Sequence, residues 1–370
     1  MKWKNQIVNL HAYQPGKSID EVKKMYNLKE IFKLASNENP YGFSNKVKKI
    51  LDEDSSSTFS YYPDGYATNL REEAAKFLGV RPTQLIFSNG TDELLQIISK
   101  ALLEPGKNTV MAYPTFSQYK HNAILEGAEV REIPLIDGNH DLDNMLKALD
   151  DQTAIVWLCS PNNPTGTYIT NDKLMKFLQQ VPKDILVVLD EAYYEYVDAD
   201  DYYDALSLLD NYQNLIVTRT FSKIYGLASF RVGYGIASEE IISTLEPVRQ
   251  PFNTNVLAQK VAMEALKDQE FVAKCATLNK KEMERFYAFC KKNNLHYYPS
   301  QGNFILIDFQ CDSDEVFTFL LSTGYIVRSG KQLGFPTSIR VTIGTSEQNS
   351  GVMTSMEAFL EKQALKAKNI

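Results

Sequence analysis

Short runs of apolar residues alternate with amphipathic stretches of helical period through the first two thirds of the chain. The apolar runs predict buried β-strands at 85–87, 109–111, 153–159, 185–189, 215–218 and 233–237. The stretches between them have the spacing of helices that bury one face. This alternation is typical of an α/β fold in which helices cover both faces of a mostly parallel central sheet.

The pattern changes after about residue 250. Long helical stretches are predicted near 255–294, followed by apolar runs at 303–308 and 339–343 that predict strands. With 370 residues, the chain exceeds the roughly 250 to 300 residues at which a single core stops growing. We therefore expect two domains, a large α/β domain and a smaller α+β domain at the carboxyl end.

One predicted helix begins directly after a glycine. Gly90 precedes it, Thr91 is expected to cap it, and acidic residues occupy its first turn. The free backbone N–H groups of such a first turn form a binding site for phosphate.

Composition and charge exclude several classes of protein. The chain is 44% hydrophobic and 23% charged, as is usual for a soluble globular protein. A net charge of −7 argues against a nucleic acid or an anionic membrane as partner. Neither a signal peptide nor an apolar run of 18 residues is found, which predicts a cytoplasmic location. The four cysteines lack a Cys-x-x-Cys spacing and are expected to be reduced, and the four scattered histidines do not form a metal-binding pattern.

One lysine lies among hydroxyl groups, with an arginine eight residues later. The amine of Lys223 is able to form a Schiff base with a carbonyl group. Donors that suit a phosphate dianion come from Thr220, Ser222 and Arg231. An apolar run precedes this segment, so Lys223 is expected at the carboxyl end of a strand, where open α/β sheets bind ligands. The pattern favours pyridoxal phosphate, which carries both an aldehyde and a phosphate; a solvated surface lysine is the alternative.

Two further segments upstream fit the same cofactor. Asn163 lies in a Ser-Pro-Asn-Asn-Pro-Thr-Gly sequence, and Asp190 follows an apolar run. A pyridine nitrogen withdraws electrons well only when it is protonated, and the carboxylate of Asp190 is suited to keep it so. Tyr193 and the amide of Asn163 are expected to donate to the phenolic oxygen of the cofactor. Each feature alone also fits an ordinary turn or strand end, but their order along the chain favours one shared site.

Together these motifs resemble the fold-type I pyridoxal-phosphate-dependent aminotransferases, from about residue 13 to residue 345. Within that family the chain is most similar to the histidinol-phosphate aminotransferases. The closer similarity rests on the segments 13–18, 34–42, 61–65, 89–93, 219–223 and 338–344. The resemblance implies a homodimer with shared active sites. It also implies an amino-terminal arm (1–40) that packs with the small domain, a large cofactor-binding domain (41–252) and a small domain (253–370).

The resemblance assigns a role to each candidate residue. Lys223 would hold the cofactor and then move a proton as general acid and base, with Asp190 and Tyr193 completing the catalytic set. Phe116 would stack on the pyridine ring; a plain core aromatic is the alternative. The phosphate is assigned to Gly90, Thr91, Thr220, Ser222, Arg231 and, from the other subunit, Tyr62, for which a simple Tyr-Pro turn is the alternative.

Substrate choice is assigned to Arg340, Arg328 and Tyr13. Arg340 matches the arginine that binds a substrate carboxylate in the general family. Histidinol phosphate has a phosphate ester at that place and glutamate has carboxylates, so one pocket must accept both anions. Arg328 and Tyr13 would suit the larger charge of the phosphate; a surface salt bridge is the alternative for Arg328.

The expected reaction is the reversible transfer of an amino group between L-histidinol phosphate and 2-oxoglutarate in histidine biosynthesis. An aromatic-amino-acid aminotransferase, or an enzyme with both activities, stays open because a flat pocket that takes imidazole also fits phenyl and phenol rings. A pyridoxal-phosphate-dependent decarboxylase is a more distant alternative on the same fold. A transcriptional sensor would need a DNA-binding segment, and none fits before Tyr13 in this acidic chain.

Overall fold

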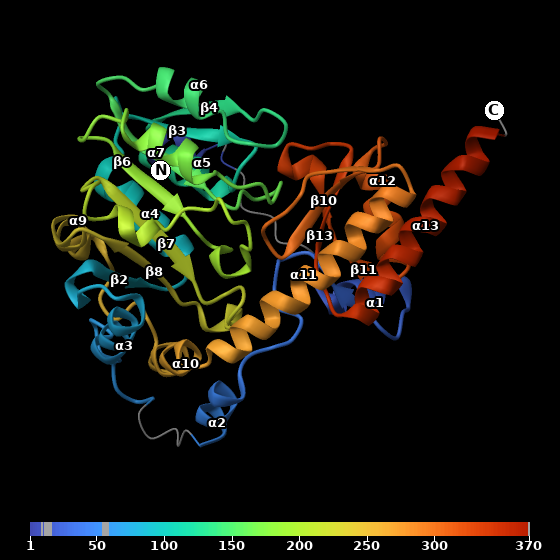
Figure 1. The fold of residues 1–370 in the computed structure, drawn as a ribbon, viewed down its shortest axis with the longest axis horizontal. Helices are drawn as coiled ribbons and strands as arrows, with labels where there is room; N and C mark the ends of the chain where they lie inside the picture. Colours follow the sequence, from blue (N-terminus) through green and yellow to red (C-terminus); the bar gives the residue numbers. More distant parts are fainter. Residues whose placement is uncertain (9, 11–16, 54–58, 369–370) are drawn as a thin grey trace.

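The computed structural model describes residues 1–8, 10, 17–53 and 59–368. Its centre is a seven-stranded sheet of order β2-β8-β7-β6-β5-β3-β4 (Figure 1), in which β8 is antiparallel to both neighbours and the other pairs are parallel. The strands are β2 (Leu85–Ser88), β3 (Asn108–Tyr113), β4 (Glu129–Pro134), β5 (Thr153–Cys159), β6 (Leu186–Asp190), β7 (Leu215–Thr220) and β8 (Gly233–Ala237). The six strands predicted in this region are therefore confirmed.

Strand β4 was not predicted, because it does not form an apolar run. It lies at the edge of the sheet, where its side chains are exposed or partly buried. An edge strand covered on fewer sides needs fewer apolar residues than the fully buried strands beside it.

Helices cover both faces of this sheet. Along β6, Leu186 and Val188 point into one apolar cluster, whereas Val187 and Leu189 point into the other. The first cluster contains residues of α4 (Thr91–Leu102), α5 (Ser117–Glu126) and α9 (Glu239–Leu245). The second contains residues of α2 (Asn45–Glu53), α3 (Thr68–Leu78), α6 (Leu142–Lys147), α7 (Asn171–Leu178), α8 (Ala205–Leu208) and α10 (Val256–Leu266). The predicted α/β fold class is confirmed.

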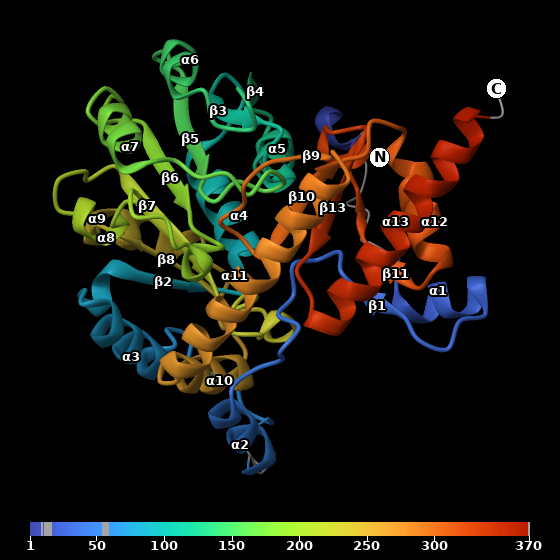
Figure 2. The same ribbon diagram turned by 45° about the vertical axis from the view of Figure 1, so that its right-hand side comes forward.

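A second, antiparallel sheet of order β12-β13-β10-β9 has its own core (Figure 2). Its strands are β9 (His296–Tyr297), β10 (Phe304–Asp308), β12 (Arg328–Ser329) and β13 (Ser338–Thr342). The helices with residues in this core are α11 (Gln269–Lys292), α12 (Ser313–Ser322) and α13 (Ser346–Lys368). Near the amino terminus, α1 (Ile19–Tyr26) is followed by β1 (Phe32–Lys33), which pairs with β11 (Tyr325–Ile326). Single turns of 3₁₀-helix lie at η1 (Asn5–Ile7), η3 (Pro82–Gln84), η4 (Tyr194–Tyr196), η5 (Ala228–Phe230), η6 (Glu246–Val248) and η7 (Gly330–Leu333).

The segment after β1 joins the two sheets. Leu34 accepts a backbone hydrogen bond from Thr342 of β13 at 2.9 Å, and Asn37 donates a side-chain hydrogen bond to Tyr193, which follows β6. The predicted domain limits at residues 40 and 252 remain a proposal; α10, just beyond the second limit, packs against α2 and α3.

The start of α4 differs from the prediction in one respect. Gly90 is the capping residue, with φ of 77°, and Thr91 is the first residue of the helix. The prediction that Thr91 caps the helix is wrong, because its hydroxyl donates to the carbonyl oxygen of Arg219 at 3.2 Å.

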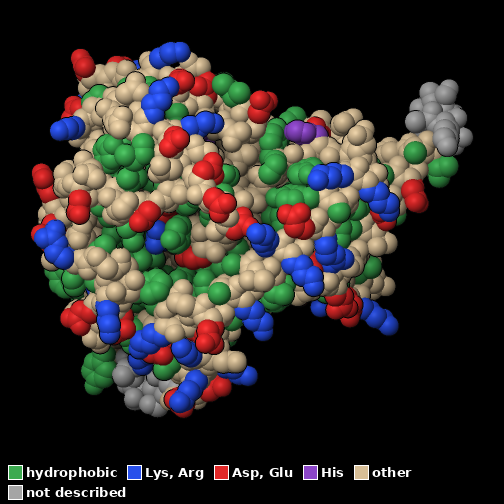
Figure 3. Space-filling view, in the orientation of Figure 1, with side chains coloured by type: hydrophobic (Ala, Val, Ile, Leu, Met, Phe, Trp, Pro, Cys, Tyr) green, Lys and Arg blue, Asp and Glu red, His purple; other side chains and the backbone are tan. Residues whose placement is uncertain are grey.

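No helix in the described part of the chain is long and apolar enough to cross a membrane. The four cysteines are free, as predicted. Acidic and basic side chains are intermixed over the face seen in Figure 3.

Candidate active site

A cavity of about 180 Å³ lies where the carboxyl ends of β5, β6 and β7 face β12, β13 and the segment after β1. Eleven of the residues proposed from the sequence line it: Thr91, Phe116, Asn163, Asp190, Tyr193, Thr220, Ser222, Lys223, Arg231, Arg328 and Arg340. Segments that are far apart in the sequence therefore meet at one place. A larger pocket of about 500 Å³ lies beside Arg219, but it is not lined by a lysine, and Glu191 pairs with that arginine at 2.8 Å.

Lys223 lies in the loop after β7 with its amine inside the cavity. Its Nζ donates to the carbonyl oxygen of Ser36 at 3.1 Å and lies 5.7 Å from the centre of the Tyr193 ring. Burial, followed by the positive charge of Arg340, lowers the pKa of Lys223 to about 8. A larger fraction of the amine than in an ordinary lysine is therefore neutral, and thus nucleophilic, near neutral pH.

Asp190 ends β6 and is almost completely buried. Its Oδ2 accepts a hydrogen bond from the Tyr119 hydroxyl at 2.5 Å, and its Oδ1 accepts one from the backbone N–H of Ala192 at 3.1 Å. Burial raises the pKa of Asp190, while the bond from Tyr119 opposes that change. The result is a carboxyl group fixed in a weakly polar environment, facing the cavity.

Tyr193 lies three residues after Asp190, in the turn that follows β6. The side-chain amide of Asn37 donates to its hydroxyl at 2.9 Å, and burial raises the pKa of this phenol. The ring packs edge-on against Phe304, with 5.0 Å between the ring centres. The hydroxyl is therefore protonated and held by an accepted bond, which leaves its own proton available for a ligand.

The residues proposed to bind phosphate form a polar group at the start of α4. Arg231 has φ of 57°, and its Nη1 donates to Ser222 at 3.3 Å. The backbone N–H of Ser222 donates to Thr220 Oγ1 at 3.1 Å. A Cβ at Gly90 would overlap the guanidinium of Arg231, so the glycine lets the arginine lie against the helix start. Arg231 also lies 3.5 Å from Asp92, an ion pair on the exposed side of this group.

The opposite wall of the cavity carries two arginines. Arg328 of β12 and Arg340 of β13 are directly opposite each other in the antiparallel register. Arg340 Nη1 donates to the side-chain oxygen of Asn163, and its Nη2 donates to the carbonyl of Ala35 at 2.6 Å. Like charges at opposed positions on neighbouring strands repel each other, and an anion between them would offset that repulsion.

Gly90 and Tyr62 do not line the cavity, although Gly90 lies against the guanidinium of Arg231. Tyr62 is 82% exposed and stacks on Phe252, with 4.7 Å between the ring centres. Tyr13 lies outside the described residues. Ser36, Asn37 and Tyr119 were not predicted as site residues, although Ser36 and Asn37 lie in the segment 34–42 that resembles the family.

Comparisons with known proteins identify the family of the chain. Residues 29–355 match the model of the family "Aminotransferase class I and II". The chain is 57% identical to the histidinol-phosphate aminotransferase of Geobacillus thermodenitrificans over 365 residues, which cover 99% of this chain and 100% of that protein. The chain therefore belongs to the class I and II aminotransferases, within the group of histidinol-phosphate aminotransferases.

Solved structures share the fold. The histidinol-phosphate aminotransferase from Sinorhizobium meliloti in complex with pyridoxal-5'-phosphate has a TM-score of 0.89 at 24% identity, covering 98% of both chains. The L-threonine-O-3-phosphate decarboxylase from Porphyromonas gingivalis has a TM-score of 0.79 at 22% identity, covering 90% of this chain and 100% of that one. Because a decarboxylase shares the fold, the fold alone does not define the reaction.

Proposed function

We propose that this protein uses pyridoxal phosphate to transfer an amino group reversibly between L-histidinol phosphate and 2-oxoglutarate, giving imidazole acetol phosphate and L-glutamate in histidine biosynthesis. The observation that carries the proposal is the joint position of Lys223 and the opposed pair Arg328 and Arg340 in one cavity. The similarity to the Geobacillus enzyme over the full chain supports this substrate. We also propose a cytoplasmic location.

The donors around the cavity fit pyridoxal phosphate. Asp190 provides a buried carboxylate for the ring nitrogen, and Tyr193 and Asn163 provide donors for the phenolic oxygen. The group at Gly90, Thr91, Thr220, Ser222 and Arg231 provides N–H, hydroxyl and guanidinium donors for the phosphate. When bound, the cofactor supplies an aldehyde that reacts with amines and a ring that withdraws electrons from the substrate carbon.

Residues of the chain provide the base and orient the cofactor ring. Lys223, with its lowered pKa, is able to act as a general base that accepts a proton from the substrate carbon. The protonated amine would then act as the general acid that donates this proton in the next step. Asp190 keeps the ring nitrogen protonated, because a carboxylate in a buried environment pairs strongly with a cation. Phe116 lies at the start of α5 and is suited to cover one face of the ring.

The arginine pair explains how one pocket accepts two kinds of anion. Arg340 is 6% exposed and is held by Asn163 and Ala35, which suits a fixed contact with a carboxylate or a phosphate. Arg328 adds a second positive charge, which interacts more strongly with a phosphate dianion than with a carboxylate. Tyr13 remains a proposed third contact.

We propose a homodimer in which Tyr62 reaches the phosphate site of the partner. Aromatic side chains near this position are exposed, among them Tyr61 at 76% and Tyr66 at 65%. An exposed apolar surface of this kind is typical of a subunit interface, and a second copy of the chain is the occupant that completes the phosphate site.

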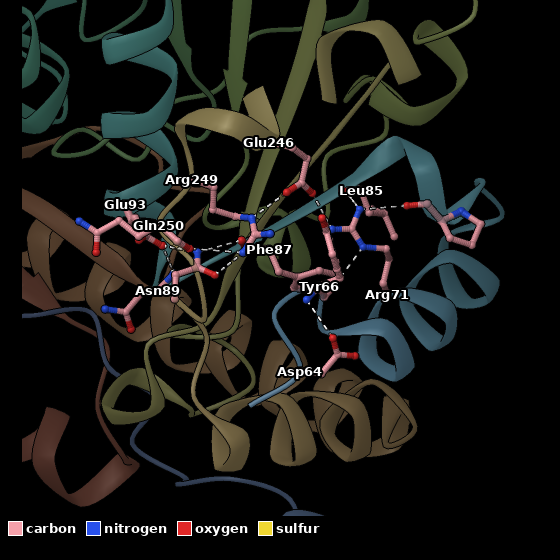
Figure 4. A network of polar contacts seen from close by, with 12 residues as sticks. Asp64, Tyr66, Arg71, Leu85, Phe87, Asn89, Glu93, Glu246, Arg249 and Gln250 are labelled. Carbon is pink, nitrogen blue, oxygen red and sulfur yellow. Dashed lines mark hydrogen bonds and ion pairs between the residues drawn. The ribbon is translucent and has the colours of Figure 1, made fainter. Parts of the chain in front are cut away.

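A polar network joins the segment of Tyr66 to the loop before α4 (Figure 4). Glu246 pairs with Arg71 at 2.7 Å and with Arg249 at 2.8 Å, and the guanidinium of Arg249 lies 5.6 Å from the centre of the Tyr66 ring. Farther along the network, the backbone N–H of Asn89 donates to Glu93 at 2.6 Å. The network therefore fixes the segment of Tyr66 relative to the loop before α4 within one subunit.

A comparison of amino donors tests the proposed reaction. With 2-oxoglutarate as acceptor, kcat/KM for L-histidinol phosphate is expected to exceed the values for phenylalanine and tyrosine. A preference for phenylalanine or tyrosine would assign the chain to the aromatic aminotransferases. Release of carbon dioxide without amino transfer, measured with an amino acid donor, would instead support a decarboxylase.

A further inference from the structure

The hydroxyl of Tyr119 is directed at the carboxylate that faces the cofactor site. The 2.5 Å hydrogen bond to Asp190 Oδ2 joins a residue of α5 to the end of β6. Tyr119 is completely buried, and burial followed by the nearby charge of Asp190 raises the pKa of its phenol well above the usual range. A phenol that stays protonated next to a carboxylate donates a hydrogen bond to that carboxylate.

The ring of Tyr119 is fixed on two sides. It stacks on Trp157 with 4.8 Å between ring centres and an interplanar angle of 9°. It also meets Phe116 edge to face at 5.6 Å and 82°. Two aromatic contacts of this kind restrict rotation of the ring, so the direction of the hydroxyl is set by the fold.

We propose that Tyr119 is a positioning residue for the reaction: it orients the Asp190 carboxylate toward the cofactor ring nitrogen and weakens the affinity of that carboxylate for a proton. The inference rests on the proposed cofactor site but not on the identity of the substrate. Ala192 binds the other oxygen at 3.1 Å, so the two donors hold the carboxyl group in one plane. The other titratable or charged groups that line the same cavity are Asp92, Cys159, Tyr193, Lys223, Arg231, Arg328 and Arg340.

A purely structural role would leave the cofactor unaffected. A buried tyrosine hydroxyl commonly needs a partner, and any acceptor would satisfy it. Tyr287 is such a case: its hydroxyl bonds with the backbone of Ser300, and its ring stacks on Tyr297 at 5.0 Å. Tyr287→Phe is therefore a matched control that removes a bonded hydroxyl from a stacked tyrosine that does not line the cavity.

The test is an absorbance titration of the holoenzyme with pH, without substrate, for the parent, Tyr119→Phe and Tyr287→Phe. Without its donor, Asp190 holds a proton more tightly and competes with the ring nitrogen. Less positive charge then lies near the nitrogen of Lys223 that holds the cofactor, so this nitrogen keeps its proton to a higher pH. The midpoint of the absorbance titration is therefore expected to rise by about 0.5 to 1 pH unit in Tyr119→Phe. The value of kcat is expected to fall roughly tenfold with little change in KM. Tyr287→Phe is expected to change neither quantity.

An unchanged midpoint in a folded, cofactor-loaded Tyr119→Phe protein would overturn the inference. If that variant does not fold, Trp157→Phe provides the second test, because it weakens the stack and keeps the hydroxyl. A smaller upward shift is expected there, and no shift would again overturn the inference. A parent protein that binds no cofactor would instead refute the proposed function.

Discussion

Asn37 and Tyr193 are joined by a 2.9 Å hydrogen bond, although 156 positions separate them in the sequence. Asn37 lies after β1 with φ of 57°, and Thr342 of β13 also bonds to it. One side chain thus connects the amino-terminal segment, the small sheet and the candidate active site. The position of Tyr193 depends on how that segment packs.

The variant Asn37→Gly tests this dependence. Glycine adopts a positive φ without strain, so the change removes the amide and leaves the backbone free to keep its shape. Loss of the hydrogen bond to Tyr193 is expected to lower kcat by about fivefold, which corresponds to the free energy of an ordinary hydrogen bond, about 1 kcal/mol. In the background of Tyr193→Phe the same change is expected to have little further effect. Strictly additive losses would show that the two residues act independently.

A second prediction concerns the pH dependence of cofactor capture. The pKa of Lys223 is lowered to about 8, so its amine is mostly charged at pH 7 and mostly neutral at pH 9. Because the neutral amine is the nucleophile, the rate at which the apoenzyme captures pyridoxal phosphate is expected to rise with pH through a midpoint of about 8. Stopped-flow absorbance measures this rate. A midpoint near 10.5, the ordinary lysine value, would contradict the effect of burial.

A third prediction separates the donors through Arg328. Arg328→Ala is expected to reduce kcat/KM for histidinol phosphate about 30- to 150-fold more than for phenylalanine, because the dianion loses a charge-assisted contact. The control is Arg81→Ala, which removes an arginine from an exposed ion pair with Glu239. Equal losses for both donors would show that Arg328 is structural.

A fourth prediction uses mixed dimers. Lys223→Ala and Tyr62→Ala subunits are combined into hybrid dimers. With Tyr62 acting across the interface, each hybrid contains one site with both changes and one site with neither. If Tyr62 acts in the site of the partner, the hybrid is expected to recover about half of the parental activity per dimer, with parental affinity for the cofactor at the active site. Hybrids without recovery, or a protein that is active as a monomer, would refute the composite site.

Much of the cavity could be predicted from the sequence because its residues lie in short motifs at strand ends. Asp190 and Lys223 each follow an apolar run, and parallel strands bring their carboxyl ends to one edge of a sheet. Tyr119 lacks such a signal, because its position in the sequence is typical of an ordinary core aromatic of a helix. Its hydrogen bond to Asp190 joins residues that are 71 positions apart. Thr91 was given a capping role from local preference, whereas the neighbouring strand β7 provides its hydroxyl with a different partner. Local patterns therefore predicted most residues of the candidate site, and tertiary packing decided which groups hold them.

The most direct test of the central claim is to locate the lysine that binds the cofactor. Treatment of the holoenzyme with borohydride, followed by digestion and mass spectrometry, is expected to show the cofactor attached to the peptide that contains Lys223. Lys223→Ala is expected to lose this adduct and to lose amino transfer. The control Lys176→Ala, which changes an exposed lysine paired with Asp143, is expected to keep both. An adduct on another lysine, or a Lys223→Ala protein that transaminates at near the parental rate, would contradict the account.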